Sequence, residues 1–424
     1  MLKRLFITLF CCFLTLFPLL NLKGNGIDSI PKMIKVSGYI QTQIEVAEKD
    51  GMTKVGSSTT YNPKYDQNPN FFYRYGIRRG RVKLEMKEKW AGAVFQVNLT
   101  DKGLSLRNAY ISVYDPWWNI ATFSLGIIDR NFGSELTGSS SRRESPERAL
   151  IVQKLFPEPR DLGAQVMFQL FNPWKTKNET KFKNQDLTLY LSLLSGNGIF
   201  QDDNNHLDFL SRIQYKRKKN NWNFEMGSSL YLGKVNNKDS ITYTPNLRRP
   251  GLGNFWLGTV SQPDSLLSRN YLGFDLAVTY TSNWGETTLK GEYMFGVQPS
   301  EFNDFASPEA DSYTNKYNYL RTFQGAFAYL VHTWKKVPIT AVFKYGYFDP
   351  NLIQNIYDIN SYSDLRYQSF GIGIVWDPTT YLRFMAYYDY LLNENYGFSF
   401  GFPGLLLPHD LKDNILTFRL QYKF

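Results

Sequence analysis

The sequence is dominated by segments of about ten residues in which apolar and polar side chains alternate. In RRGRVKLEMK (78–87) the charged side chains share one parity, namely Arg79, Arg81, Lys83 and Glu85. The residues between them are glycine or apolar. A period of two indicates a β-strand with two unlike faces. The same alternation returns at 92–99, 107–114, 187–193 and 415–424, so strands separating an apolar from a polar medium are predicted along the chain.

Alternating segments of this length are typical of a transmembrane β-barrel, because only a closed sheet satisfies every backbone group in lipid. Sixteen candidate strands begin near Ile34, Phe72, Ala91, Ser105, Ile120, Leu162, Asp186, His206, Asn221, Asn270, Glu286, Thr322, Pro338, Tyr367, Thr380 and Asn414. A large soluble β-sandwich also alternates. However, the polar face here carries adjacent cations, and the last strand runs to an aromatic C-terminal residue, Phe424. The expected fold is therefore all-β, a sixteen-stranded antiparallel transmembrane barrel.

The predicted connections differ in length in a regular way. Those after even-numbered strands are short, and most of those after odd-numbered strands are long. The long ones are 47–71, 129–161, 234–269, 297–321, 348–366 and 392–413, and the exceptions are 100–104 and 172–185. Short periplasmic turns and long extracellular loops produce this alternation in barrels, which would place both termini in the periplasm.

The N-terminus is predicted to be a secretory signal peptide, residues 1–26. An apolar run, Leu5–Leu20, follows Lys3 and Arg4 and holds both cysteines of the chain. After cleavage, residues 27–424 would form a single cysteine-free barrel domain. A mean hydropathy of −0.37 excludes a polytopic helical membrane protein. The expected location is the outer membrane of a Gram-negative bacterium, in contact with outer-membrane lipid.

The net charge is +10, and the signal segment carries three cations and no acid, so the mature chain has +7. An exported basic protein attracts anionic lipid headgroups or anionic solutes, whereas nucleic acid is not an expected partner. In the predicted barrel, Arg79, Arg81 and Lys83 line the lumen at spacings of about 6.6 Å, with Glu85 below them. A row of cations spaced in this way, which we call the ladder, can pass an anion from one side chain to the next along a pore. The alternative is a structural network in which Glu85 and acidic residues of the opposite wall neutralise the positive potential of these cations.

Stretches spread over the whole mature chain resemble the phosphate-selective porins O and P. They include RRGRVKLEMK, LRNAYISVY, LGIIDRNFGSE, SSSRRESPER, RDLGAQ, SGNGIFQDDNN, LKGEYM, KYGYFDPN and FRLQYKF, in this order. The resemblance implies a homotrimeric outer-membrane porin that lets small anions such as phosphate diffuse passively. It also implies that the third extracellular loop, 129–161, folds into the pore and constricts it.

The charged residues of that loop region are then candidates for the constriction: Arg142, Arg143, Glu144, Glu147, Arg148 and Arg160. A charged ring at a narrow place decides which ions enter, because desolvation and local potential are strongest there. The alternative is a solvated loop whose charges pair with one another.

Two other functions remain open, a non-conducting barrel that acts as a binding or structural partner and an outer-membrane hydrolase. The histidines His206, His332 and His409 have no motif-spaced nucleophile or acid beside them. Patterns for GxSxG, HExxH or a cysteine–histidine metal site are also missing from the sequence. We therefore expect no enzyme activity, no catalytic or metal-binding residue and no cofactor.

Overall fold

The computed structural model describes residues 34–118, 120–170, 186–237, 239–245, 256–262, 265–308, 318–352, 362–394 and 410–424. The predicted signal peptide and His409 lie outside the described residues. One compact unit, Lys35–Phe424, holds almost all of the described chain.

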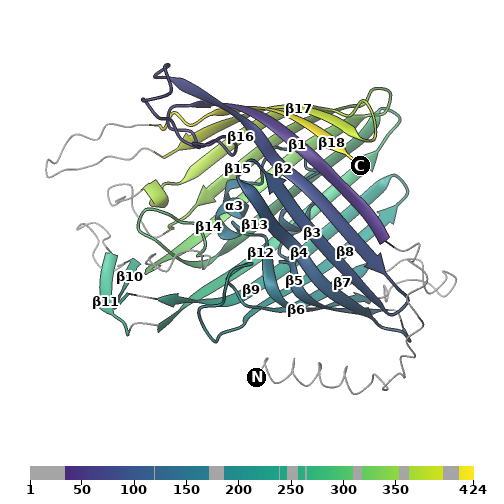
Figure 1. Ribbon diagram of the computed structural model, residues 1–424, viewed down its shortest axis with the longest axis horizontal. Helices are drawn as coiled ribbons and strands as arrows, with labels where there is room; N and C mark the ends of the chain where they lie inside the picture. Colours follow the sequence, from purple (N-terminus) through teal and green to yellow (C-terminus); the bar gives the residue numbers. More distant parts are fainter. Residues whose placement is uncertain are drawn as a thin grey trace. The chain divides into compact units, whose positions relative to one another are not determined.

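A closed antiparallel sheet of sixteen strands forms the wall of this unit (Figure 1). The strands of its first half are β1 (Ile34–Glu48), β2 (Phe71–Lys87), β3 (Ala91–Thr100), β4 (Gly103–Tyr114), β5 (Ala121–Asp129), β6 (Arg160–Leu170), β7 (Leu187–Leu194), β8 (Asp208–Lys219) and β9 (Trp222–Asn237). Those of the second half are β12 (Ser265–Thr281), β13 (Gly285–Ser300), β14 (Tyr319–Trp334), β15 (Ile339–Asp349), β16 (Tyr367–Trp376), β17 (Leu382–Asn393) and β18 (Ile415–Lys423).

Each wall strand pairs with its neighbours along the chain, β9 with β12, and β18 with β1, which closes the barrel. The predicted all-β barrel of sixteen antiparallel strands is confirmed. All sixteen predicted starts agree with the structure to within five residues, the largest difference being Asn270 predicted against Ser265 observed. Most long and most short connections fall at opposite ends of the wall, which we call the long-loop end and the short-turn end; the short β3–β4 turn and the long β6–β7 connection are the two exceptions that the sequence indicated.

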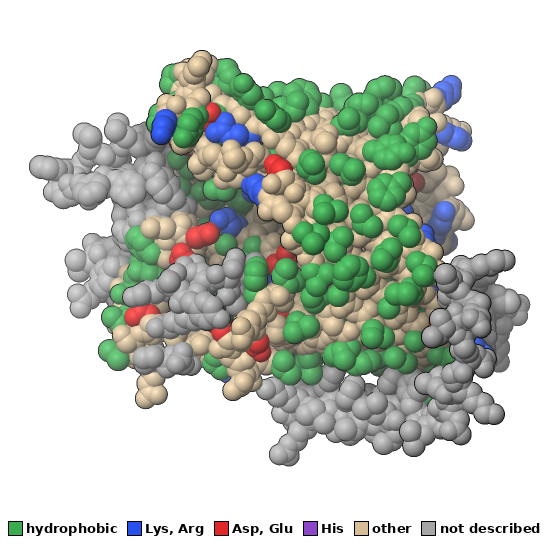
Figure 2. Space-filling model, in the orientation of Figure 1, with side chains coloured by type: hydrophobic (Ala, Val, Ile, Leu, Met, Phe, Trp, Pro, Cys, Tyr) green, Lys and Arg blue, Asp and Glu red, His purple; other side chains and the backbone are tan. Residues whose placement is uncertain are grey.

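The alternation of each strand decides which side chains point outward. On β14, Phe323, Phe327 and Tyr329 are buried on the inner face, whereas Leu330 and Trp334 are exposed on the outer one. Figure 2 shows hydrophobic side chains gathered over the outer wall. A continuous apolar outer face of this extent needs a lipid environment.

Several elements lie outside the sixteen-stranded wall. The loop between β5 and β6 (130–159) carries two short helices, α2 (Ser134–Thr137) and α3 (Leu150–Leu155). Between β9 and β12, a hairpin of β10 (Ile241–Pro245) and β11 (Trp256–Val260) is inserted. None of the helices in the described residues is both long enough and apolar enough to cross a membrane.

The β5–β6 loop packs against the inner face of the wall. Its aromatic residues Phe132 and Phe156 have ring centroids 5.1 Å apart and meet Tyr231 and Tyr271 of β9 and β12. The helix α3 buries Ile151, Val152 and Leu155 in the same apolar cluster, which also includes inner residues of β13 to β17. Apolar packing thus fills part of the interior, and buried ion pairs such as Arg269 with Asp208 lie on the same strands.

Candidate channel site

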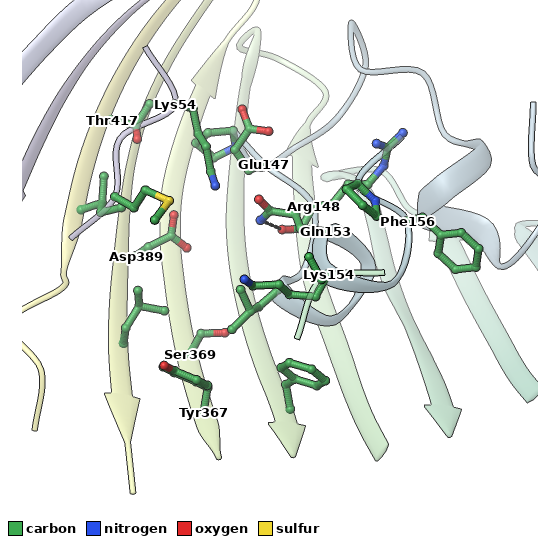
Figure 3. Close-up of a pocket in the computed structure, with 18 of the residues that line it drawn as sticks. Lys54, Glu147, Arg148, Gln153, Lys154, Phe156, Tyr367, Ser369, Asp389 and Thr417 are labelled. Carbon is green, nitrogen blue, oxygen red and sulfur yellow. Dashed lines mark hydrogen bonds between the residues drawn. The ribbon is translucent and has the colours of Figure 1, made fainter. Parts of the chain in front are cut away.

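A cavity of about 600 Å³ lies beside the apolar cluster, between the β5–β6 loop and the inner faces of the first and last strands. Figure 3 shows Glu147, Arg148, Gln153 and Lys154 of the loop facing residues of β16 to β18 across it. The cationic lining residues are Lys54, Arg78, Arg79, Arg81, Arg107, Arg143, Arg148, Lys154 and Lys344, and the acidic ones are Glu45, Asp50, Glu147, Asp304, Asp389 and Asp413. Nine cations against six acids leave the described lining positive.

Glu147 is the main acidic anchor of this cavity. Its carboxylate accepts hydrogen bonds from Arg78 at 2.8 Å, from Arg79 at 2.8 Å and from Arg419 of β18 at 3.1 Å. Burial alone would raise the pKa of Glu147, but the three guanidinium groups hold it well below its usual range. The loop is therefore tied to β2 and β18 by a carboxylate that stays ionised at neutral pH.

The alternation of β2 shifts by one residue at Arg78 and Arg79. Tyr73, Tyr75 and Ile77 are exposed on the outer face before this point, yet two adjacent arginines both reach the inner carboxylate. A local irregularity of this kind changes the face of the sheet to which the side chains point. It brings Arg78 into the cavity, although the sequence alternation assigned only the odd-numbered residues to the lumen.

A second irregularity brings Arg107 inward. The β3–β4 register runs from Gln96 with Asn108 to Val97 with Leu106, so Arg107 is the extra residue of a bulge. Its Nη1 donates to Glu158 of the β5–β6 loop at 2.6 Å. Five inward-facing cations were not predicted from the sequence: Arg78, Arg107, Lys54, Lys344 and Arg419. Of these, Arg419 had a usable signal, since it lies on the polar parity of the last strand.

Three cavity arginines have nitrogen atoms without a hydrogen-bond partner among the described residues: Arg81, Arg107 through its Nε, and Arg143. Arg143 is 7% exposed, and neither its Nη1 nor its Nη2 has a hydrogen-bond partner among the described residues. The Nε of Arg81 is also buried without such a partner, and its guanidinium lies 5.9 Å from the ring centroid of Tyr39. Burial, reinforced by the nearby charge of Arg143, lowers the pKa of Arg148 to about 9. These cations line one cavity and repel one another.

The remaining predicted site residues are paired or exposed. Lys83 donates to Glu85 at 2.6 Å, so this rung of the predicted ladder is neutralised within its own strand. Glu144 accepts from Lys290 of β13 at 2.8 Å, and Arg160 lies 3.1 Å from Asp129. Arg142 is exposed. The cavity thus brings together five of the predicted residues: Arg79, Arg81, Arg143, Glu147 and Arg148.

The two described histidines have different surroundings. His332 points outward, with its ring centroid 4.8 Å from that of Trp334 and its Nδ1 2.9 Å from the hydroxyl of Thr287. Nδ1 of His206 lies 3.5 Å from a carboxylate oxygen of Asp208. In the described part of the chain, groups of three or more metal-ligating side chains are not found.

No family model and no curated protein matches the sequence. The fold, however, is similar to that of solved outer-membrane barrels. They include the outer membrane channel DcaP of Acinetobacter baumannii (12% identity, 92% of this chain and 97% of that chain covered, TM-score 0.54). An anion-selective porin from Comamonas acidovorans matches at 9% identity (92% and 99% covered, TM-score 0.52). OmpT, an outer membrane protein of Vibrio cholerae in its trimer form, matches at 11% identity (92% and 99% covered, TM-score 0.50). A closed wall with an apolar outer face and this fold make the chain an integral outer-membrane protein, as the sequence predicted.

Proposed function

We propose that the protein is a porin through which small hydrophilic solutes diffuse passively, with a preference for anions. The observation that carries this proposal is the buried guanidinium of Arg143, which lines the cavity without an acidic partner among the described residues. An unpaired buried cation strongly favours a nearby anion over a nearby cation. The three arginines around Glu147 share its carboxylate, so this cluster also keeps a net positive charge, but each of its guanidinium groups already has a hydrogen-bond partner.

In this proposal the β5–β6 loop is the constriction. Its residues Arg143 and Arg148 face β2 residues Arg79 and Arg81 in the same cavity, with the apolar cluster closing the other side. An anion would pass between the loop and the wall of the first and last strands. Lys83 and Glu85 would lie below this passage as a self-neutralised pair.

The test is the reversal potential of the reconstituted protein in a salt gradient across a planar bilayer. We expect the parent to favour chloride over potassium, and Arg81→Gln with Arg143→Gln to move the reversal potential toward the cation side. Arg142→Gln is the matched control, because it removes an exposed arginine next to Arg143 that does not line the cavity. An unchanged reversal potential in the double variant would reject the anion preference.

The resemblance to the phosphate-selective porins O and P supports a narrower proposal, that phosphate is a preferred solute. Guanidinium groups bind phosphate oxygens with bidentate geometry, and Arg81 and Arg143 have nitrogen atoms available for this. We expect millimolar phosphate to reduce the chloride current. A chloride current that phosphate leaves unchanged would remove this narrower proposal.

The trimeric state of the OmpT neighbour supports a homotrimer for this chain. Sedimentation equilibrium in a density-matched detergent gives the mass directly, and a monomer mass would contradict the proposal.

One observation favours a different function, a non-conducting barrel with a binding or structural role. The apolar cluster fills much of the interior with large side chains such as Phe132, Phe156 and Tyr271. Single-channel recording separates the two proposals, since a barrel without open channels at any voltage would support the second.

A further inference from the structure

Exposed tryptophan is concentrated at the short-turn end of the barrel. Of the eight tryptophans in the described residues, seven are exposed and lie in a short turn or at the strand end beside one: Trp90, Trp117, Trp118, Trp222, Trp284, Trp334 and Trp376. The eighth, Trp256, belongs to the inserted hairpin. Membrane interfaces enrich tryptophan because one part of the indole is apolar and its N–H is polar. Among the described residues, exposed tryptophan is thus concentrated at one end of the wall.

Exposed cations share this end of the wall. They are Lys87, Lys89, Lys216, Arg217, Lys218, Lys219, Lys335 and Lys336, whereas the exposed acids in the same described turns and strand ends are Glu88 and Glu286. Lysine and arginine side chains are visible along the right-hand edge of Figure 2, the end away from the β10–β11 hairpin. Some cations touch the aromatic rings, as Lys89 does with Trp90 at 5.2 Å from the ring centroid. We call this ring of aromatic and basic residues the collar.

The collar is best defined where β8 meets β9. Lys216 forms an ion pair with Glu225 at 3.0 Å and belongs to the inner face, together with Lys218. Arg217 and Lys219, of the opposite parity, therefore point to the outer face. Their direct cross-strand partners are Phe224 and Trp222. The end of β8 thus carries two cations that point to the lumen and two that point to the membrane.

Arg217 and Lys219 lie next to a group of aromatic side chains on the outer face. The ring centroid of Trp222 is 4.6 Å from that of Tyr280 on β12 and 6.0 Å from that of Phe224. Met226 and Leu276 continue the outer face toward the middle of the wall, and both are exposed. A cation on the lipid-facing side destabilises a barrel most at the bilayer midplane and much less near an interface. Arg217 and Lys219 therefore lie at the headgroup level.

We propose that the outward-facing residues of the collar bind the headgroups of anionic phospholipids in the leaflet at the short-turn end. Arg217 and Lys219 would hold the phosphate, and Trp222, Phe224 and Tyr280 would support the glycerol and upper acyl chains. Charge complementarity favours an anionic over a zwitterionic phospholipid by about 1 kcal/mol, or about fivefold, for each basic residue near the surface.

A lipid leaflet fits the collar better than a second copy of this chain. The exposed tryptophans lie at the ends of strands around the wall, from β3 and β4 through β9, β13 and β14 to β16. A neighbouring barrel would cover only one sector of this ring, whereas a leaflet surrounds it completely. The proposal concerns the outer face and does not depend on what the channel carries.

The experiment uses a local probe on the outer face. Ile213, two positions before Tyr215 on the same outward parity of β8, is 46% exposed and is replaced by cysteine to carry a fluorophore. The labelled barrel is reconstituted with phosphatidylcholine, and quenching is compared between acyl-brominated phosphatidylglycerol and acyl-brominated phosphatidylcholine. We expect phosphatidylglycerol to associate up to about 25-fold more strongly, about fivefold for each of the two outward cations, and molar salt to weaken this preference.

The decisive variant is Arg217→Gln with Lys219→Gln, which should lower the preference for phosphatidylglycerol by about fivefold for each cation removed. Lys216→Gln with Lys218→Gln is the matched control, since it removes two cations from the inner face of the same strand end. Equal quenching by the two lipids in the parent would overturn the proposal. So would a preference that survives the outward double variant, or a probe that neither lipid quenches because a second copy covers it.

Discussion

At the scale of single residues, Glu147 determines how the β5–β6 loop is held. It is 15% exposed and receives hydrogen bonds from Arg78, Arg79 and Arg419. Replacing it by glutamine would leave three inward guanidinium groups without their carboxylate. Because removing one partner of a buried ion pair typically costs about 3–5 kcal/mol, we expect Glu147→Gln to lower the free energy of unfolding by about 3 kcal/mol. Urea titration of the barrel in lipid vesicles measures this loss.

The control for this variant is Glu144→Gln. Glu144 pairs with Lys290, and both side chains are 28% exposed, so a cost of only about 0–1 kcal/mol is expected. The pKa of Glu147 lies well below 4.5, so its stabilisation is complete above pH 4.5 and disappears only as pH falls through the folded-state value. The difference between Glu147→Gln and the parent should therefore stay constant from pH 8 to pH 6. A difference that vanishes at pH 6 would contradict this assignment.

At the scale of elements, the period of two was enough to locate every wall strand. It could not locate the irregularities. Strict alternation assigns Arg78 to the outer face and gives no sign that Arg107 is the extra residue of a bulge. Both deviations depend on which inner partner is available, Glu147 and Glu158 respectively, and these partners come from a loop distant in sequence.

The β10–β11 hairpin and the helices α2 and α3 were also not predicted. The helices have four and six residues, too few for a helical period to appear in the sequence. Their stability comes from the wall. Glu292 of β13 accepts N–H groups of Ser134 and Glu135 at the start of α2, and Gly133 before it has a φ of +63°, a conformation that favours glycine. The loop's sequence thus predicted charges near the lumen but not the apolar packing that positions them.

This packing can be tested at α3. Phe156, which follows the helix, is 2% exposed and contacts the rings of Phe132, Tyr231 and Tyr271. We expect Phe156→Ala to lower the free energy of unfolding by about 3–5 kcal/mol because of the lost contacts and the cavity left behind. With its anchor weakened, the loop should also give noisier single-channel currents.

Gln153→Ala is the matched control in the same segment. Gln153 donates to the carbonyl of Arg148 at 2.8 Å from a partly exposed position, so about 1 kcal/mol or less should be lost. Equal losses for the two variants would mean that the apolar cluster does not hold the loop.

At the scale of the whole molecule, the interior combines an apolar cluster with buried ion pairs and a cavity lined by charged side chains. The sequence indicated a positive lumen from its net charge and from Arg79, Arg81 and Arg143, and all three line one cavity. It gave no means of separating paired from unpaired arginines, since Lys83 with Glu85 pairs within a strand while Arg143 is left without an acid among the described residues. The selectivity of such a lumen depends on the unpaired charges rather than on the total.

The balance of charge in the cavity should therefore change with pH. Asp413, before β18, lines the cavity, and burial together with the charges of Asp410, Glu48 and Asp50 raises its pKa to about 7. As pH falls from 8 to 6, its carboxylate takes up a proton and the cavity loses one negative charge. We expect the anion-to-cation permeability ratio to rise over this interval. Reversal potentials measured in one salt gradient at several pH values provide the titration curve.

Two variants make this assignment specific. Asp413→Asn should abolish the step near pH 7 and fix the permeability ratio at its low-pH value. Asp410→Asn should keep the step but move its midpoint to lower pH, because one of the charges that raises the pKa of Asp413 is gone. A step that persists in Asp413→Asn would assign the titration to another group. A midpoint unmoved by Asp410→Asn would leave burial as the main cause and show that the acidic neighbours are screened by solvent.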